Sequence, residues 1–173
     1  MRKILLVIDM QNDFVDGALG SPEAVAALPC VLREIAKYPK ENIIATRDTH
    51  AEDYMQTREG RYLPVPHCIK NTTGWELNPE VAAAVDGCLI IDKPTFGSTA
   101  LCDHICSLAQ KEKIEVTLIG LCTDICVVSN AMLIKAALPE IDVKIVADAC
   151  AGVTPESHRA ALQTMQMCQI EIA

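Results

Sequence analysis

Cys126 is the residue whose type and position point most directly to chemistry. It ends the segment Gly120-Leu-Cys-Thr-Asp-Ile-Cys126, where an apolar, strand-like run meets the start of a helix. Thr123 is a good N-cap, which predicts that Cys126 falls in the first helical turn. Unpaired backbone N–H groups and the helix dipole favour a thiolate there. The position therefore predicts a nucleophile, and a buried structural thiol is the alternative for any one of the nine cysteines.

Two charged residues stand at comparable places elsewhere in the chain. Asp9 directly follows the apolar run Ile4–Ile8, and Lys93 comes shortly after the run Cys88–Ile91. In open α/β sheets the carboxyl ends of the strands border the ligand crevice, so both side chains are candidates for that crevice. Taken singly, Asp9 could equally cap a turn, and Lys93 could be a solvated side chain.

A third group of residues could hold a metal ion. Asp48 and His50 are two residues apart, so in an extended segment their side chains project to the same side. His67 could supply a third ligand from the same long loop, and Glu59 could supply a fourth. This set of nitrogen and oxygen donors suits zinc, iron or manganese. A single histidine is more often a surface or capping residue, but two of the four histidines in one loop favour a metal site.

The elements that would position these residues can be read from the alternation of apolar runs and amphipathic stretches. The strand-like runs are Ile4–Ile8, Asn42–Thr46, Cys88–Ile91, Val116–Gly120, Val143–Ala147 and, more weakly, Gln169–Ile172. The helix-like stretches between them are Pro22–Ala36, Pro79–Val85, Ser98–Gln110, Asp124–Ala137 and Pro155–Met167. This alternation predicts an α/β domain over residues 1–173, with a parallel sheet covered by helices on both faces. The irregular stretch from residue 47 to about 78 is long enough to be functional.

Composition narrows the class of protein further. The net charge of −8 argues against binding to nucleic acid or to an anionic membrane, and no apolar run approaches the length of a membrane helix. Nine cysteines are an odd number in a chain whose N-terminus reads as a strand rather than a secretory signal. We therefore expect reduced thiols in a cytoplasmic protein. The pairs Cys102/Cys106 and Cys122/Cys126 could suggest a zinc site, but small core thiols are the favoured interpretation.

Five segments, taken in order, resemble the isochorismatase-like cysteine hydrolases and, within them, the nicotinamidases. They are Asp9-Met-Gln-Asn-Asp-Phe14, Arg47-Asp-Thr-His50, His67-Cys68, Asp92-Lys-Pro-Thr-Phe96 and Gly120-Leu-Cys-Thr-Asp-Ile-Cys126. The resemblance covers essentially the whole chain. It implies a three-layer α/β/α fold with a mostly parallel central sheet of about six strands. It also implies hydrolysis of nicotinamide, a step in NAD salvage.

The resemblance assigns a role to each catalytic candidate. Cys126 would attack the amide carbon, Asp9 would take the thiol proton and pass it to the departing ammonia, and Lys93 would lower the pKa of the thiol. The backbone N–H groups of Cys122 and Cys126 would form the oxyanion hole. The family also implies a cis peptide bond between Leu121 and Cys122.

The same resemblance implies one divalent metal ion, which would bind the pyridine nitrogen of the substrate and orient the ring. Its ligands would be Asp48, His50 and His67, with Glu59 resembling a fourth ligand that some members add. The residues implied to contact the substrate are Phe14, Leu121 and Cys122. Family members are often dimers or tetramers, so the resemblance also admits a homo-oligomer.

Departures from the family pattern keep other substrates and functions open. Position 122 is usually Ala or Thr in the family but is Cys here, and the segment after His67 differs as well. The alternatives are a related cysteine hydrolase acting on another small amide, carbamoyl or ureido compound, a zinc-dependent hydrolase that uses no thiol, and a non-enzymatic thiol or metal sensor.

Overall fold

A six-stranded sheet forms the centre of the molecule. The computed structural model describes all 173 residues. The strands are β1 (Arg2–Ile8), β2 (Ile43–Asp48), β3 (Leu89–Lys93), β4 (Ile114–Leu121), β5 (Asp142–Ala151) and β6 (Glu171–Ile172), in the spatial order β3-β2-β1-β4-β5-β6. Every neighbouring pair is parallel, so the expected mostly parallel sheet is parallel throughout.

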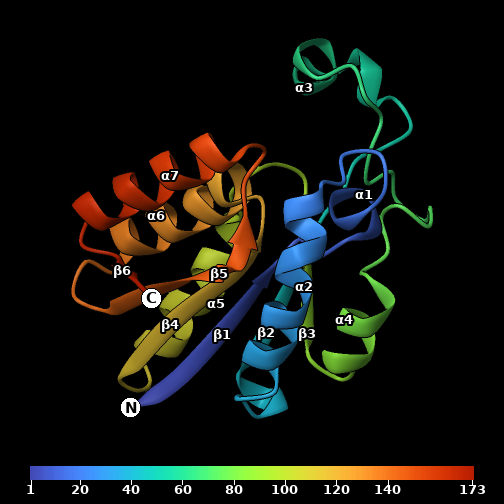
Figure 1. Cartoon of the computed structure of the whole chain (residues 1–173). Coiled ribbons are helices and arrows are strands. Elements are labelled where there is room, and N and C mark those ends of the chain that lie inside the picture. The colour runs from blue at the N-terminus through green and yellow to red at the C-terminus, as the bar shows by residue number, and fades with distance from the viewer.

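Helices cover the sheet on both faces, which confirms the expected three layers (Figure 1). On one face lie α5 (Thr99–Ala109), α6 (Val128–Ala137) and α7 (Pro155–Met167), and on the other lie α1 (Asn12–Val15), α2 (Pro22–Ile35) and α4 (Pro79–Ala84). Proline occupies the first turn of α2, α4 and α7, and a side chain caps the N-terminus of each. Their start points could therefore be predicted from the sequence, whereas the four-residue α1 could not.

The apolar run of β1 shows why the sheet must be covered on both sides. Ile4, Leu6 and Ile8 pack among α5, α6 and α7, whereas Leu5 and Val7 pack against α2 and α4. Successive side chains of a strand point to opposite faces, so a continuous apolar run needs an apolar partner on each face. The two cores that result hold the carboxyl ends of β1, β2, β3 and β4 at the same edge of the sheet.

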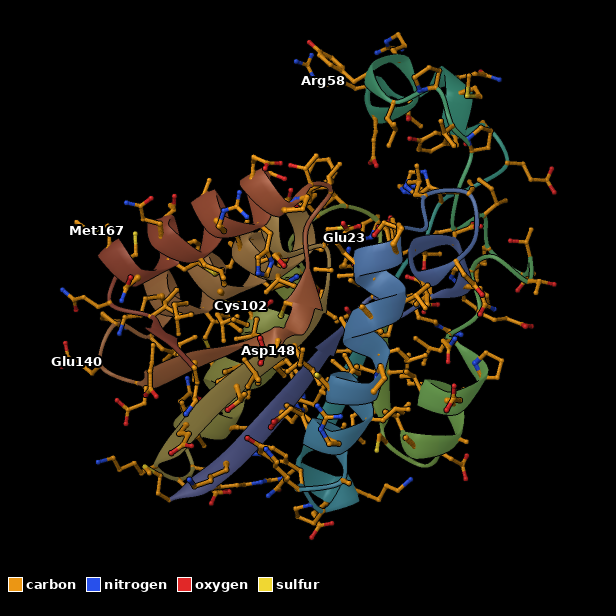
Figure 2. The ribbon with its side chains drawn as sticks, viewed as in Figure 1. Glu23, Arg58, Cys102, Glu140, Asp148 and Met167 are labelled. Atoms are coloured by element: carbon orange, nitrogen blue, oxygen red, sulfur yellow. The ribbon has the colours of Figure 1, made fainter.

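The long stretch after β2 rises from that edge and stands apart from the layers (Figure 1). It was expected to be irregular, but it contains a 3₁₀ turn (Tyr54–Gln56) and the short helix α3 (Arg58–Tyr62). Figure 2 shows Arg58 at the projecting end of this segment, well away from the packed helices. We call residues 49–67 the lid segment. None of the helices is long and apolar enough to cross a membrane.

Candidate active site

The turn that carries Cys126 follows directly from β4. Residues Thr123–Val127 form a π-helical turn, in which the carbonyl of Cys122 accepts a hydrogen bond from the N–H of Val127 at 3.0 Å. Such turns are rare in proteins as a whole, and those that occur are often at functional sites. The peptide bond between Leu121 and Cys122 is cis, as expected from the family resemblance. Cys126 thus lies in the first turn after the strand, as the sequence predicts.

The predicted role of Thr123 as the N-cap is wrong, because Cys122 occupies the cap position and caps no backbone group with its side chain. Thr123 is instead completely buried, and its hydroxyl lies 2.8 Å from Nδ1 of His158 on α7. Asp124 accepts hydrogen bonds from the N–H of Val153 through both carboxylate oxygens. The turn is therefore fixed to the neighbouring β5–α7 connection rather than capped from within.

Lys93 is the centre of the polar contacts beneath this turn. Its ammonium lies 2.7 Å from Oδ2 of Asp9, 3.3 Å from Oδ1 of Asp48 and 3.4 Å from Sγ of Cys126, and it donates to the Thr95 carbonyl at 3.0 Å. The Lys93 and Asp9 side chains are both inaccessible to solvent. Asp9, Lys93 and Cys126 are far apart in the chain. They meet because β1, β3 and β4 end at the same edge of the sheet, which is the placement that the sequence predicts.

Asp9 is held in a fixed orientation. The hydroxyl of Thr46 donates to its Oδ1 at 2.6 Å and accepts from its backbone N–H at 3.2 Å. The other oxygen, Oδ2, faces Lys93 but makes no well-aligned hydrogen bond. Asp9 also adopts a positive φ of 48°, a conformation that clusters at functional sites when a residue other than glycine adopts it. Oδ2 is therefore held by the charge of Lys93 and keeps a lone pair that can accept a proton.

Burial controls the ionisation of this group. It raises the pKa of Asp9, and the Lys93 ammonium only partly offsets that effect. Burial, together with the Asp9 carboxylate, also raises the pKa of the Cys126 thiol well above its usual value, although Lys93 acts in the opposite direction. The expectation that the first helical turn would favour a resting thiolate is therefore wrong, because desolvation outweighs the lysine.

Asp48 joins this catalytic group to the expected metal ligands. Its Oδ1 contacts Lys93 and its Oδ2 lies 2.9 Å from Nε2 of His50. Gln11 holds the Asp48 backbone on both sides, accepting from its N–H at 2.7 Å and donating to its carbonyl at 2.8 Å. Burial alone would raise the pKa of Asp48, but hydrogen bonds from His50 and His67 and the charge of Lys93 bring it well below the usual carboxyl range.

The four expected metal ligands do converge. One donor atom from each of Asp48, His50, Glu59 and His67 lies within 4.8 Å of the others. Nδ1 of His67 lies 2.8 Å from the carbonyl of Val65, and because a carbonyl can only accept, this nitrogen carries the proton. When the imidazole is neutral, the lone pair of Nε2 therefore faces Asp48 and Glu59, each 3.7 Å away. A hydrogen bond from the other ring nitrogen fixes the tautomer and the orientation of a metal-binding histidine, so the donors present fit a divalent ion such as zinc, iron or manganese.

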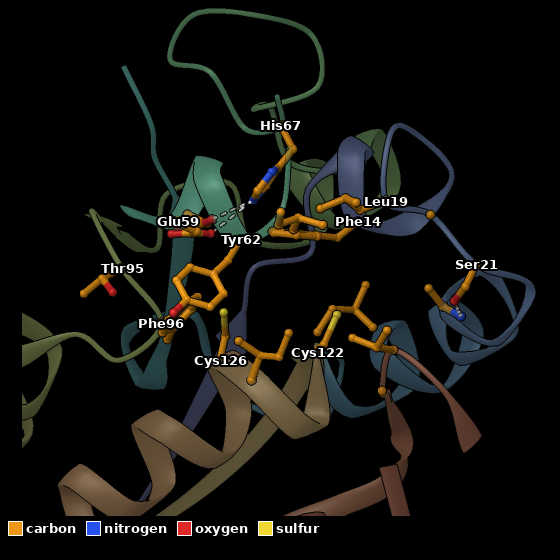
Figure 3. Close-up of a pocket in the computed structure, with 18 of the residues that line it drawn as sticks. Phe14, Leu19, Ser21, Glu59, Tyr62, His67, Thr95, Phe96, Cys122 and Cys126 are labelled. Atoms are coloured by element: carbon orange, nitrogen blue, oxygen red, sulfur yellow. Dashed lines mark hydrogen bonds and ion pairs between the residues drawn. The ribbon is translucent and has the colours of Figure 1, made fainter. Parts of the chain in front are cut away.

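A cavity of about 1050 Å³ opens above the Cys126 turn. Figure 3 shows Cys122 and Cys126 pointing into it from below, with Glu59 and His67 facing it from the lid segment. Phe14, Leu121 and Cys122, which the resemblance implied as substrate contacts, all line it. Asp9, Lys93 and His50 lie behind the lining and reach it through their contacts with Cys126 and Asp48.

Sequence reasoning did not identify several residues that hold the site together. They are Gln11, Thr46, Tyr54 and Asn130, all of which are buried. Tyr54 packs against both histidines, with ring centroids 4.8 Å from His50 and 5.0 Å from His67. The only sequence signal for Thr46 is its place as a polar residue near the end of a buried strand. The partners of the other three come from distant parts of the chain or from a loop of no regular pattern.

The chain resembles proteins of known activity over its whole length. The isochorismatase domain family matches residues 3–173. The nicotinamidase/pyrazinamidase of Mycobacterium tuberculosis is 24% identical over 185 residues, covering 98% of this chain and 97% of that protein. The crystal structure of nicotinamidase/pyrazinamidase from Bacillus subtilis superposes with a TM-score of 0.82 and 28% identity over 100% of both chains. The pyrazinamidase of Pyrococcus horikoshii in complex with zinc superposes with a TM-score of 0.80 and 29% identity, covering 100% of this chain and 99% of that one.

Proposed function

Because this chain belongs to the isochorismatase domain family, we propose that it is a nicotinamidase, which hydrolyses nicotinamide to nicotinate and ammonia. One observation carries the proposal: the Asp9–Lys93–Cys126 group and the two-histidine metal group serve a single cavity and are joined through Asp48. A pyridine carboxamide has a ring nitrogen at one end and an amide at the other, so it matches both groups at once.

Asp9 is the base of the first half-reaction. The thiol of Cys126 is protonated at rest, so its proton passes to Oδ2 of Asp9, the oxygen that faces Lys93, as the sulfur attacks the amide carbon. The neighbouring ammonium of Lys93 stabilises the negative charge that develops on the sulfur. Asp9 then gives the same proton to the amide nitrogen, which leaves as ammonia, and a thioester to Cys126 remains.

The second half-reaction uses the same residues in reverse. Asp9 takes a proton from water, the hydroxide attacks the thioester carbon, and the Cys126 sulfur leaves and regains a proton. In both halves the carbonyl oxygen becomes negative, and the backbone N–H groups of Cys122 and Cys126 are the donors proposed to face it. Each donor of this type contributes about 3 kcal/mol to transition-state stabilisation.

The residues proposed to hold a divalent metal ion are Asp48, His50, Glu59 and His67. When bound, the ion supplies a Lewis acid for the pyridine nitrogen, which orients the ring. Phe14 lies beside His67, with ring centroids 5.5 Å apart, and is placed to contact one face of the substrate ring. Leu121 and Cys122 line the floor of the same cavity.

The direct test is ammonia release from nicotinamide by reduced, metal-loaded protein, with Cys126→Ala as the matched variant. We expect release by the unaltered chain and none by Cys126→Ala, whose metal content should be unchanged because Cys126 is not among the ligands. Turnover by Cys126→Ala would favour a metal hydrolase that needs no thiol. If the unaltered chain released no ammonia, nicotinamide would be rejected, and a panel of small amides and ureido compounds would follow.

A further inference from the structure

Asn130 is a buried residue whose side chain binds the backbone of Cys126 and of the loop that follows Lys93. It lies on the first turns of α6 and is 1% exposed. Its Nδ2 donates to the carbonyl of Cys126 at 2.8 Å and to the carbonyl of Phe96 at 3.2 Å, and its Oδ1 accepts from the N–H of Ser98 at 2.9 Å. The amide cannot be reversed, because its oxygen would then face two carbonyl oxygens.

These three bonds connect two segments that are about 30 residues apart in the chain. The Nδ2 group donates both to the backbone of the nucleophile and to the loop that follows β3, and Oδ1 accepts from the same loop. That loop also contains the Thr95 carbonyl, which accepts from the Lys93 ammonium at 3.0 Å. Gly97, between the two anchored residues, allows the loop to lie directly on α6, since a Cβ there would be 3.4 Å from Cβ of Ser129 and closer to Leu133.

We propose that Asn130 is a positioning residue that clamps the Cys126 turn to the Lys93 loop and so sets the 3.4 Å separation between the thiol and the ammonium. The inference rests on the proposed function, in which that separation stabilises charge on the sulfur. Asn130 makes no hydrogen bond to the proposed metal ligands or to Phe14, Leu121 and Cys122, the proposed ring contacts. Loss of the clamp should therefore slow the chemical step and leave substrate binding unchanged.

The experiment compares Asn130→Ala with Ser98→Ala. Ser98→Ala removes the side chain that caps α5 but keeps the backbone N–H that Asn130 binds, so it weakens the start of α5 and leaves all three Asn130 bonds in place. For Asn130→Ala we expect kcat to fall about 10- to 100-fold, the range typical of a misplaced reacting group. KM for nicotinamide and metal content should stay at the wild-type values. Ser98→Ala should retain kcat.

A second readout needs no substrate and so separates this inference from the proposed function. Mass spectrometry measures how fast Cys126 is alkylated by iodoacetate, which is negatively charged, and by iodoacetamide, which is neutral. Both reagents need the same access to the thiol, so the ratio of the two rates reports the positive charge beside it. We expect the ratio to fall several-fold in Asn130→Ala and to be unchanged in Ser98→Ala. Should Asn130→Ala fail to fold, Asn130→Ser replaces it, because a serine can reach the Cys126 carbonyl but cannot bridge to the loop.

Equal kcat values and equal alkylation ratios for Asn130→Ala and Ser98→Ala, measured per folded molecule, would overturn the clamp. So would a rise in KM with kcat unchanged, since that pattern marks a role in binding. If the wild-type chain proved inactive on nicotinamide but the alkylation ratio still fell in Asn130→Ala, the proposed function would fail and the clamp would stand.

Discussion

At the scale of single residues, the site depends on a thiol and a carboxylate that are both costly to ionise. Burial raises the pKa of Cys126 and of Asp9, so neither carries its charge as readily as it would in water. The buried Lys93 ammonium supplies a positive charge and contacts both. A proton shared between sulfur and carboxylate keeps the net charge of the group constant while the reaction proceeds. The arrangement thus favours proton transfer over a resting thiolate.

The raised pKa of Asp9 predicts the acid side of the pH profile. Asp9 must be deprotonated to accept the thiol proton, so kcat/KM should fall as the pH drops through the pKa of this carboxyl. Since burial moves that pKa upward, the fall should come at a higher pH than the ordinary value of 3.8. A pH–rate profile with nicotinamide would show this, with Asp9→Asn inactive at every pH. An acid limb at the ordinary carboxyl value would contradict the assignment of Asp9 as the base.

The Asp9–Lys93 pair also makes a prediction about stability. Both side chains are fully buried, and removal of one partner leaves the other as an uncompensated buried charge. Lys93→Met should therefore lower the free energy of unfolding by about 3–5 kcal/mol. The double variant Asp9→Asn/Lys93→Met should recover part of that loss, although both variants are inactive. Urea denaturation measures the difference, and a double variant no more stable than Lys93→Met would refute the argument.

At the scale of elements, the regular parts of the structure could be predicted because their signals are local. The helix over Pro155–Met167 has the predicted bounds, since a proline, a capping threonine and apolar spacing act over adjacent residues. The cap expected at Thr123 could not be predicted correctly, because its hydroxyl is engaged by His158 on another helix. Position at strand ends brought Asp9, Lys93 and Cys126 together. The hydrogen bonds of Asn130 could not be predicted, because two of its three partners lie in a loop with no periodic pattern.

The lid segment gives a prediction that belongs to an element rather than to one side chain. Gly60 lies in α3 beside the proposed metal ligand Glu59, and a Cβ there would collide with the carbonyl oxygen of Tyr54. Gly60→Ala should therefore push α3 away from the Tyr54–Gln56 turn and move Glu59 from the histidines. We expect weaker metal binding and a loss of about 1–3 kcal/mol of stability.

Metal titration against a competing chelator would measure this effect. Glu52→Ala, at an exposed position of the same segment, serves as the control and should bind metal as the unaltered chain does. Normal metal affinity in Gly60→Ala would show that Glu59 is not a ligand, even though its carboxylate oxygen lies 3.7 Å from Nε2 of both histidines. Asp48, His50 and His67 would then account for binding alone.

At the scale of the whole molecule, the metal group couples the lid segment to the sheet. Asp48 ends β2, whereas Glu59 and His67 belong to the segment that stands apart from the layers (Figure 1). An ion bound to all of these residues would therefore link the lid segment to the end of β2. Because the donors converge only in the folded chain, binding must also favour folding over unfolding.

This coupling predicts that the melting temperature depends on the metal. A metal concentration about 100 times Kd adds about 2.7 kcal/mol to the free energy of unfolding. For a chain of this size that corresponds to a rise in Tm of roughly 5–10 °C. Calorimetry before and after chelation should show the rise with zinc, iron or manganese, and the order of the three shifts would identify the preferred ion.

Two variants serve as controls for this rise in Tm. The rise should be much smaller in His50→Ala but equal to that of the unaltered chain in Cys126→Ala, since only the first removes a proposed ligand. A Tm that does not respond to metal in the unaltered chain would mean that these four side chains form a polar cluster without an ion, and the orientation of the ring would then have to come from the cavity wall alone.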